Sequence, residues 1–257
     1  MDTKYWGPSG WRLLHLIAEN QTVTASHNKK FWSIIPYILP CKFCRASLST
    51  YYEQYPIPSN PKEIGPWLYK IHNCVNAKLR EQGQTIIDPP YSIVKKHYRD
   101  LLASSCTETT FPGWEFLFCI ADNYPGSAPS KPMPDTPEGA ERTSIGIRNK
   151  YNLLTDAERI DALGTFWSLL PTVLPYTEWR TVWSMHCTAK KEACITDFGG
   201  RAAAKRRLWK IKCAMDAALE KHGTDTYYGI CREVAAKRSG CSTARRARTC
   251  RARPKKQ

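Results

Sequence analysis

The stretch ILPCKFCRAS at residues 38–47 places two cysteines, Cys41 and Cys44, three positions apart and directly after a proline. Such a pair can form a structural disulfide, supply half of a zinc site, or work as a redox dithiol. If a helix begins after Pro40, its free backbone N–H groups and its dipole stabilise a thiolate and lower the pKa of the thiol. The placement therefore favours a reactive dithiol.

The two other uses explain the sequence less well. Zinc takes about four ligands, and His72 and Cys74, the residues available to complete the set, point away from each other if they are two apart on a helix. The chain has no second Cys-x-x-Cys. A disulfide that closes so short a loop adds little stability. We therefore predict a redox pair and no metal ligands.

Composition places the protein in a reducing compartment. No apolar run approaches the roughly 18 residues that span a bilayer, and the start, MDTKYWGPSG, has no hydrophobic signal region. We expect a cytoplasmic protein without a membrane segment. In such surroundings its eleven cysteines are seldom static disulfides.

The net charge of +15 is unevenly distributed. Residues 237–257 contain nine Lys or Arg and no acid, so this stretch carries nine of the fifteen net charges. The pattern predicts a solvated, disordered tail. The alternative is non-specific binding of nucleic acid through its phosphates, because no sequence-specific recognition motif is present.

Three sequence blocks occur twice, in the same order, and must form the elements that position the cysteines. GWRLLHLIAEN (10–20) matches GWEFLFCIADN (113–123), FWSIIPYILPCKFCR (31–45) matches FWSLLPTVLPYTEWR (166–180), and WLYKIHNCVNAKLREQG (67–83) matches RLWKIKCAMDAALEKHG (207–223). The second copy of the central block has lost both cysteines. The second copy also has a longer segment after its first block. This segment, residues 123–139, is rich in Pro, Ser and Gly and predicts an exposed loop.

Each block predicts a helix, because its apolar residues recur every three or four positions. Pro40 and Pro175 separate consecutive helices. Strand signals are weak throughout. The predicted fold class is therefore all-α, with one helical bundle over 1–105, a second, degenerate bundle of the same pattern over 110–236, and the basic tail over 237–257.

The first copy resembles the Erv/ALR family of FAD-linked sulfhydryl oxidases over roughly residues 4–100. The resemblance rests on YWGPSGWRLLH (5–15), LPCKFC (39–44) and HNCVNAKL (72–79), which follow the family's W-G-x-x-x-W-x-x-x-H, C-x-x-C and H-N-x-V-N-x-K-L in order. Tyr69 stands where many members begin a second disulfide. Without this second disulfide, the chain resembles most the enzymes of large cytoplasmic DNA viruses. That resemblance implies the host cytoplasm or the virion as the location.

The resemblance implies a four-helix bundle that binds FAD and oxidises dithiols of protein substrates, with O2 as the acceptor and H2O2 as the product. It implies that Cys44 faces the flavin and that Cys41 exchanges with the incoming thiol. It further implies that the FAD site is formed by Gly7, Trp11, His15, His72, Asn73, Asn76, Lys78 and Tyr98. Glu81 replaces a second family lysine, which puts the phosphate contacts there in question, and Cys74 inside the motif is expected to be a buried free thiol.

The sequence leaves three questions open: the shuttle cysteines, the role of the second bundle and the alternatives to an oxidase. The family relays electrons through a shuttle disulfide, for which Cys241 with Cys250 in the tail and Cys187 with Cys194 are the candidates. The second bundle keeps none of the site's chemical residues, so we expect it to bind no FAD. It could serve as a built-in partner in an intramolecular pseudo-dimer or as a platform for substrates in a homodimer. The alternatives to an oxidase are a virion or scaffold protein and a zinc-stabilised nucleic-acid-binding protein.

Overall fold

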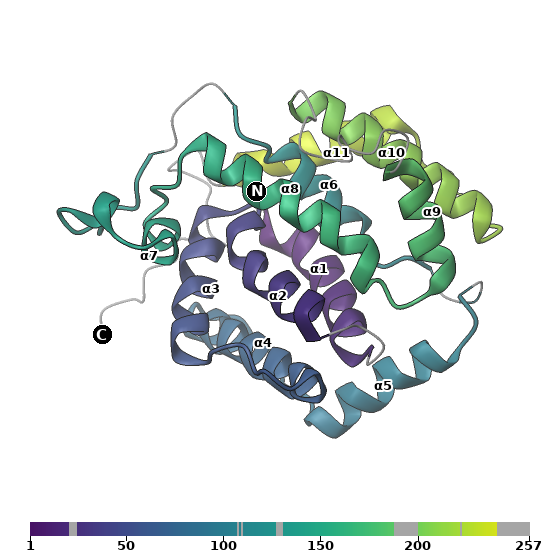
Figure 1. Ribbon diagram of the computed structural model, residues 1–257, viewed down its shortest axis with the longest axis horizontal. Coiled ribbons are helices and arrows are strands. Elements are labelled where there is room, and N and C mark those ends of the chain that lie inside the picture. Colours follow the sequence, from purple (N-terminus) through teal and green to yellow (C-terminus); the bar gives the residue numbers. More distant parts are fainter. Residues whose placement is uncertain are drawn as a thin grey trace.

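The computed structural model describes residues 1–20, 25–106, 108, 110–126, 131–187, 200–221 and 223–240. The regular structure of this part of the chain is helical (Figure 1). Its α-helices are α1 (Thr3–Glu19), α2 (Ala25–Ile38), α3 (Lys42–Gln54), α4 (Ile64–Glu81), α5 (Tyr91–Ala103), α6 (Trp114–Asp122), α7 (Ile145–Lys150), α8 (Asp156–Val173), α9 (Thr177–Cys187), α10 (Arg201–Ala218) and α11 (Tyr227–Ala236). Short 3-10 turns lie at Pro61–Glu63, Ala140–Arg142 and Lys237–Gly240.

The helices begin and end where the local sequence favours it. Asp2 caps α1 by accepting a hydrogen bond from the backbone N–H of Lys4 at 3.0 Å. Thr155 and Glu158 form a reciprocal capping box at the start of α8. Leu39 and Pro40 separate α2 from α3, and the matching Leu174 and Pro175 separate α8 from α9, because proline interrupts the backbone hydrogen-bond ladder.

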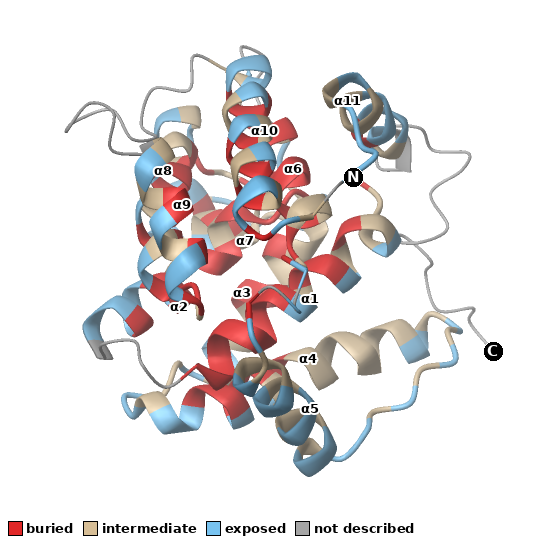
Figure 2. Cartoon of the chain, turned by 90° about the vertical axis from the view of Figure 1, so that its right-hand side faces the viewer, coloured by how far each residue is buried: buried red, intermediate tan, exposed pale blue. Residues whose placement is uncertain are grey.

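One continuous core spans both halves of the chain. Helices α1, α2, α6 and α8 contribute most of the fully buried side chains, whereas α5 has no buried residue and lies at the edge (Figure 2). Within the described residues, no helix is both long and apolar enough to cross a membrane.

Helices that carry matching sequence blocks pack against each other across this core. The contacts between α2 and α8 and between α1 and α6 are among the most extensive in the molecule. Phe31 stacks on its own sequence counterpart Phe166, with ring centroids 5.9 Å apart. Ser9 donates a hydrogen bond of 2.8 Å to the carbonyl of its counterpart Pro112. The halves therefore meet as two related surfaces, residue against matching residue.

Two matching glycines make the close approach of α1 and α6 possible. A Cβ on Gly10 would lie 3.1 Å from the ring of Phe116, and a Cβ on Gly113 would lie 2.5 Å from Leu13. Leu13 and Phe116 are themselves counterparts in the aligned blocks. This reciprocal pattern, in which residue i meets j and the counterpart of j meets the counterpart of i, is the arrangement of a two-fold symmetric interface.

Candidate active site

The cysteine pair lies at the start of α3. Cys41 is the residue that precedes the helix, in an extended conformation, and its carbonyl accepts the backbone N–H of Arg45 at 3.0 Å. Cys44 lies in the first turn of the helix. The two cysteines have different surroundings: Cys44 is half-buried and lines a cavity, whereas Cys41 is only 2% exposed and does not line it.

The cavity has a volume of about 550 Å³ and is lined mainly by α1, α3 and α4, with Ile35 of α2, Tyr98 of α5 and Phe116 of α6. Its size falls in the range of cofactor and ligand pockets. Most of the residues expected from the sequence to form the site do line it, namely Gly7, Trp11, Cys44, His72, Asn76, Lys78 and Tyr98. His15 is buried and does not line the cavity, and Asn73 is half-buried on α4 outside the lining.

Aromatic rings form one wall of the cavity. Trp11 of α1 stacks on His72 of α4, with ring centroids 3.9 Å apart and planes 11° from parallel. His15 stacks on Tyr98 of α5 at 5.2 Å. The helical spacing of Trp11 and His15, four apart, places both rings on the same face of α1. The wall thus offers flat apolar faces suited to a planar ring system.

The two histidines form a neutral pair. His15 Nε2 and His72 Nδ1 are 3.0 Å apart, in hydrogen-bond contact. Burial lowers the pKa of His15 to about 3, with a further contribution from His72, and burial lowers the pKa of His72 to about 4. Both rings are therefore uncharged at neutral pH. His15 Nδ1 is buried and has no hydrogen-bond partner among the described residues.

The charged residues that line the cavity are cations. They are Lys4, Arg12 and Lys78, and no Asp or Glu is among its described lining residues. The Lys78 ammonium donates a hydrogen bond of 2.6 Å to the Ser47 hydroxyl. The lining can therefore accept an anionic group such as a pyrophosphate.

Several residues of the site were not expected from the sequence. Ser47 follows Cys44 by three positions on α3, and that helical spacing was a usable signal. Asp88 accepts a hydrogen bond of 2.7 Å from Asn76 Nδ2 and pairs with Arg80 at 2.9 Å. The hydrogen bond from Arg80 lowers the pKa of Asp88 despite partial burial. Asp88 comes from an irregular segment, so no periodic pattern pointed to it.

The matching region of the second half has different contents. Trp179 occupies the position of Cys44 and is fully buried against Phe111 and Tyr176. Trp183 stacks parallel to Trp114 at 6.3 Å, where Trp114 is the counterpart of Trp11. Large rings therefore fill space that is open in the first half.

One of the hollows in the second half has more acidic than basic residues in its lining. It measures about 410 Å³, and its charged lining residues are Glu115, Asp216, Asp225 and Glu233 beside Lys212 and Lys221. Lys212, the counterpart of His72, is paired with Asp216 at 2.7 Å and with Asp225 at 3.2 Å. An anionic cofactor would meet repulsion here.

The described residues bring no three His, Cys, Asp or Glu side chains together as metal ligands. Of the candidate shuttle cysteines, Cys194, Cys241 and Cys250 lie outside the described residues, as does the side chain of Cys187. The prediction of a disordered tail over 237–257 is wrong for its first four residues, which form the turn Lys237–Gly240 with Arg238 paired to Asp122. Residues 241–257, with the predicted nucleic-acid contacts, lie outside the described residues.

Known proteins resemble the first half of the chain. A model of the Erv1 / Alr family matches residues 8–99. The mitochondrial FAD-linked sulfhydryl oxidase ERV1 of Saccharomyces cerevisiae is 33% identical over 86 residues, which are 31% of this chain and 46% of the yeast protein. The FAD-linked sulfhydryl oxidase of African swine fever virus (isolate Tick/Malawi/Lil 20-1/1983) is 32% identical over 84 residues, which are 30% of this chain and 71% of the viral protein. The match thus spans about half the length of the yeast relative. No solved structure matches the chain.

Proposed function

Because the chain belongs to the Erv1/Alr family, we propose that it is a FAD-linked sulfhydryl oxidase whose reactive centre lies in its first half. One observation carries the proposal: the thiol of Cys44 lines the same cavity as the Trp11–His72 stack and the cation of Lys78. A dithiol, flat aromatic faces and cationic side chains together suit a dithiol oxidase that holds a flavin dinucleotide.

The cavity fits FAD by a buried polar atom that it leaves unsatisfied. Gln82 lines the cavity, and its buried Oε1 has no hydrogen-bond partner among the described residues. Buried polar atoms are rarely left unpaired in native proteins. Lys78, Arg12 and Lys4 would meet the pyrophosphate, while the rings of Trp11 and His72 would bound the planar part of the molecule.

FAD would supply the capacity to take two electrons from a dithiol and deliver them to O2, which becomes H2O2. The protein's own steps are thiol–disulfide exchanges. A substrate thiolate attacks the Cys41 sulfur of the Cys41–Cys44 disulfide, a mixed disulfide forms, and Cys44 leaves as a thiolate. A second substrate thiolate then attacks the substrate sulfur, releases Cys41 as a thiolate and leaves the substrate oxidised.

The burial of Cys41 adds a requirement to this cycle. Its 2% exposure is too small for direct attack by a protein thiol, so the exchange step needs local opening at the start of α3. We expect small dithiols to react faster than folded protein substrates for this reason.

We propose that the second half is a built-in partner that has lost the oxidase chemistry. Its support is the reciprocal packing of Gly10 on Phe116 and Gly113 on Leu13, together with the stack of Phe31 on Phe166. Light scattering at working concentration tests this: a monomer is expected, and a stable dimer that also uses the α1 and α2 surfaces would contradict it.

A shuttle in the basic tail is a further part of the proposal. The backbone N–H of Asp2 donates to the Lys237 carbonyl at 2.9 Å, so the first residue of the basic stretch lies beside the start of α1. Residues near this start, including Lys4 and Gly7, line the cavity. Replacing Cys241 and Cys250 by serine should slow the oxidation of protein thiols and spare a small dithiol. Equal effects on both substrates would exclude the tail.

The central experiment is a visible absorption spectrum of the purified protein combined with dithiol-dependent oxygen consumption. We expect flavin bands at about one FAD per chain, and loss of oxygen consumption with retained flavin in Cys44→Ser. Two FAD per chain would contradict the assignment of the second half. A colourless protein, or an active Cys44→Ser variant, would overturn the proposed function.

A further inference from the structure

Arg45, the residue directly after Cys44, is a buried cation. It is 4% exposed, and its guanidinium donates hydrogen bonds to the carbonyl of Leu39 at 2.9 Å and to the side-chain oxygen of Asn152. No carboxylate of the described residues forms an ion pair with it. A buried charge without an opposite charge is costly, so this one calls for a physical explanation.

The electrostatic neighbours of Arg45 are the cysteine pair and a second cation. Burial lowers the pKa of Arg45, repulsion from Arg159 lowers it further, and the charges of Cys41 and Cys44 as thiolates raise it. The thiolates of the reduced pair are therefore the anions that can balance the guanidinium.

The second half of the chain separates this role from a structural one. Arg180 is the counterpart of Arg45, and it donates to the carbonyl of Leu174, the counterpart of Leu39, at 2.7 Å. Joining two consecutive helices across a proline thus needs no cysteine. Arg180 is only partly buried and completes its bonds with Pro175 and Thr177, its own near neighbours. Deep burial and the bond to a distant asparagine are confined to the cysteine-bearing copy.

Asn152 is held rigidly in place. It follows α7 in the left-handed conformation, at φ 59°, and the Leu153 N–H bonds the Arg148 carbonyl at 2.8 Å, which is a Schellman ending. Asparagine tolerates this conformation better than most residues. Its side-chain amide donates to the Lys131 carbonyl at 2.7 Å, so the oxygen is turned toward Arg45.

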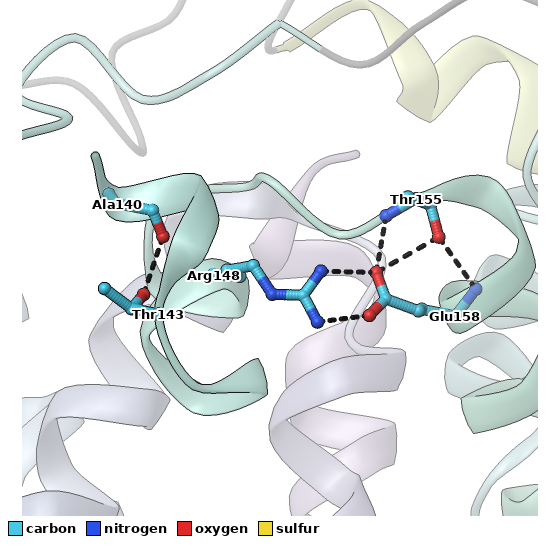
Figure 3. Close-up of polar contacts among 5 residues, drawn as sticks. All are labelled: Ala140, Thr143, Arg148, Thr155 and Glu158. Carbon is cyan, nitrogen blue, oxygen red and sulfur yellow. Dashed lines mark hydrogen bonds and ion pairs between the residues drawn. The ribbon is translucent and has the colours of Figure 1, made fainter. Parts of the chain in front are cut away.

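The element that carries Asn152 is itself fixed to both halves. Arg148 of α7 makes a two-pronged ion pair with Glu158 in the capping box of α8 (Figure 3). On the other side, Asn149 donates to the Pro36 carbonyl at 3.2 Å and to Ser49 at 2.9 Å. The second half therefore reaches the helix of the cysteine pair through α7.

The remaining charged groups around the pair add no free negative charge. On α3, the Lys42 ammonium donates hydrogen bonds to the carbonyls of Lys131 and Pro132. On α7, Arg148 and Lys150 are paired with Glu158 and Glu53. Arg159 of α8 is a further cation, with Asp156 as its electrostatic neighbour. The carboxylates named here thus neighbour cations other than Arg45.

We propose that Arg45 balances the negative charge of the reduced Cys41–Cys44 pair, and that Asn152 of the second half is the positioning residue that holds its guanidinium there. The proposal rests on the proposed function in that it takes this pair as the redox centre. It gives the second half a chemical contribution to a site from which its own cysteines have disappeared.

The test is the pH profile of alkylation of Cys44 by iodoacetamide in the reduced full-length protein, followed at that residue by mass spectrometry. Arg45→Met removes the cation, and Asn152→Asp keeps the volume but adds a negative charge beside it. An opposite charge shifts a neighbouring pKa by about one unit or more, so both variants should react about tenfold more slowly at a fixed pH below the thiol pKa. Asn152→Ala should give a smaller change.

Arg180→Met is the matched control, since it removes the same helix-joining bond in the half without cysteines. It should leave the profile of Cys44 unchanged. If Arg45→Met does not fold, the alkylation profile of Cys44 in Asn152→Asp still tests the proposal. Unchanged profiles in the folded variants, or an equal shift in Arg180→Met, would overturn the proposal. Failure of the unchanged protein to bind FAD or consume oxygen would instead refute the proposed function, because the alkylation profile requires neither.

Discussion

His15→Phe should make the protein more resistant to acid. The second half provides the precedent, because Phe118 stands at the matching position and is fully buried. In the folded chain, burial holds the pKa of His15 at about 3 and that of His72 at about 4. In the unfolded chain both return to about 6.5.

The sign follows from the proton balance. Between pH 6.5 and the folded pKa values, the unfolded state binds more protons than the folded state, so stability falls as the pH falls. In this window, each histidine lowers the free energy of unfolding by up to about 1.4 kcal/mol for every unit by which the pH falls. From pH 7 to pH 5 the loss is about 2 kcal/mol for each, or about 4 kcal/mol for the pair. The pKa of His72 stays lowered in the variant because burial is the main cause of its shift. The free energy of unfolding of His15→Phe should therefore fall by only about 2 kcal/mol from pH 7 to pH 5.

The assay is urea unfolding of both proteins without flavin at pH 7, 6 and 5, followed by tryptophan fluorescence. Differences between pH values are compared within each protein, so any change in packing at pH 7 cancels. Carboxylates with lowered pKa values, such as Asp88 and Glu158, lose their contribution only as the pH falls below about 4, outside this window. Equal losses of stability in the two proteins between pH 7 and pH 5 would refute the reasoning.

Three further predictions concern the packing and a buried ion pair. Gly113→Ala should destabilise by roughly 1–3 kcal/mol and more than Gly10→Ala in urea unfolding, because its Cβ meets a side chain at 2.5 Å rather than 3.1 Å; the reverse order would contradict the close-approach argument. Asp122→Asn should cost about 3–5 kcal/mol, since it leaves the buried ammonium of Lys205 without the partner now at 2.7 Å; a change below 1 kcal/mol would refute that account. Trp179→Ala should lower stability by about 3–5 kcal/mol yet leave the flavin content of the folded protein unchanged, whereas loss of flavin would place the cofactor near the second half.

The sequence predicted the helices of the repeated blocks because their signals are local. Apolar spacing along Trp11, Leu14 and Ala18 is a property of one helix, and α1 forms there. The repeated blocks likewise correspond to α1 and α6, α2 and α8, and α4 and α10.

What could not be predicted depends on contacts distant in the chain. Arg45 bonds Asn152, 107 residues away, and Cys41 is buried by packing rather than by its neighbours in sequence. The position of His15 behind His72, rather than in the cavity wall, depends on the side-by-side placement of α1 and α4. A motif states which residues belong together, but the order in which they stack is set by the helices that carry them.

The two halves show which physical terms hold the fold and which serve the chemistry. The close contact at Gly10 and Gly113 and the arginine bond across the proline occur in both halves, so they belong to the packing of the bundle. The charged lining is cationic in the first half, whereas the hollow in the second half has more acidic than basic residues, so the packing does not require either charge. A bundle without a ligand at this place gains stability when aromatic rings fill it, since each buried ring removes a large apolar area from water. Trp179 and Trp183 are fully buried in the second half, which also packs on the first through one continuous core.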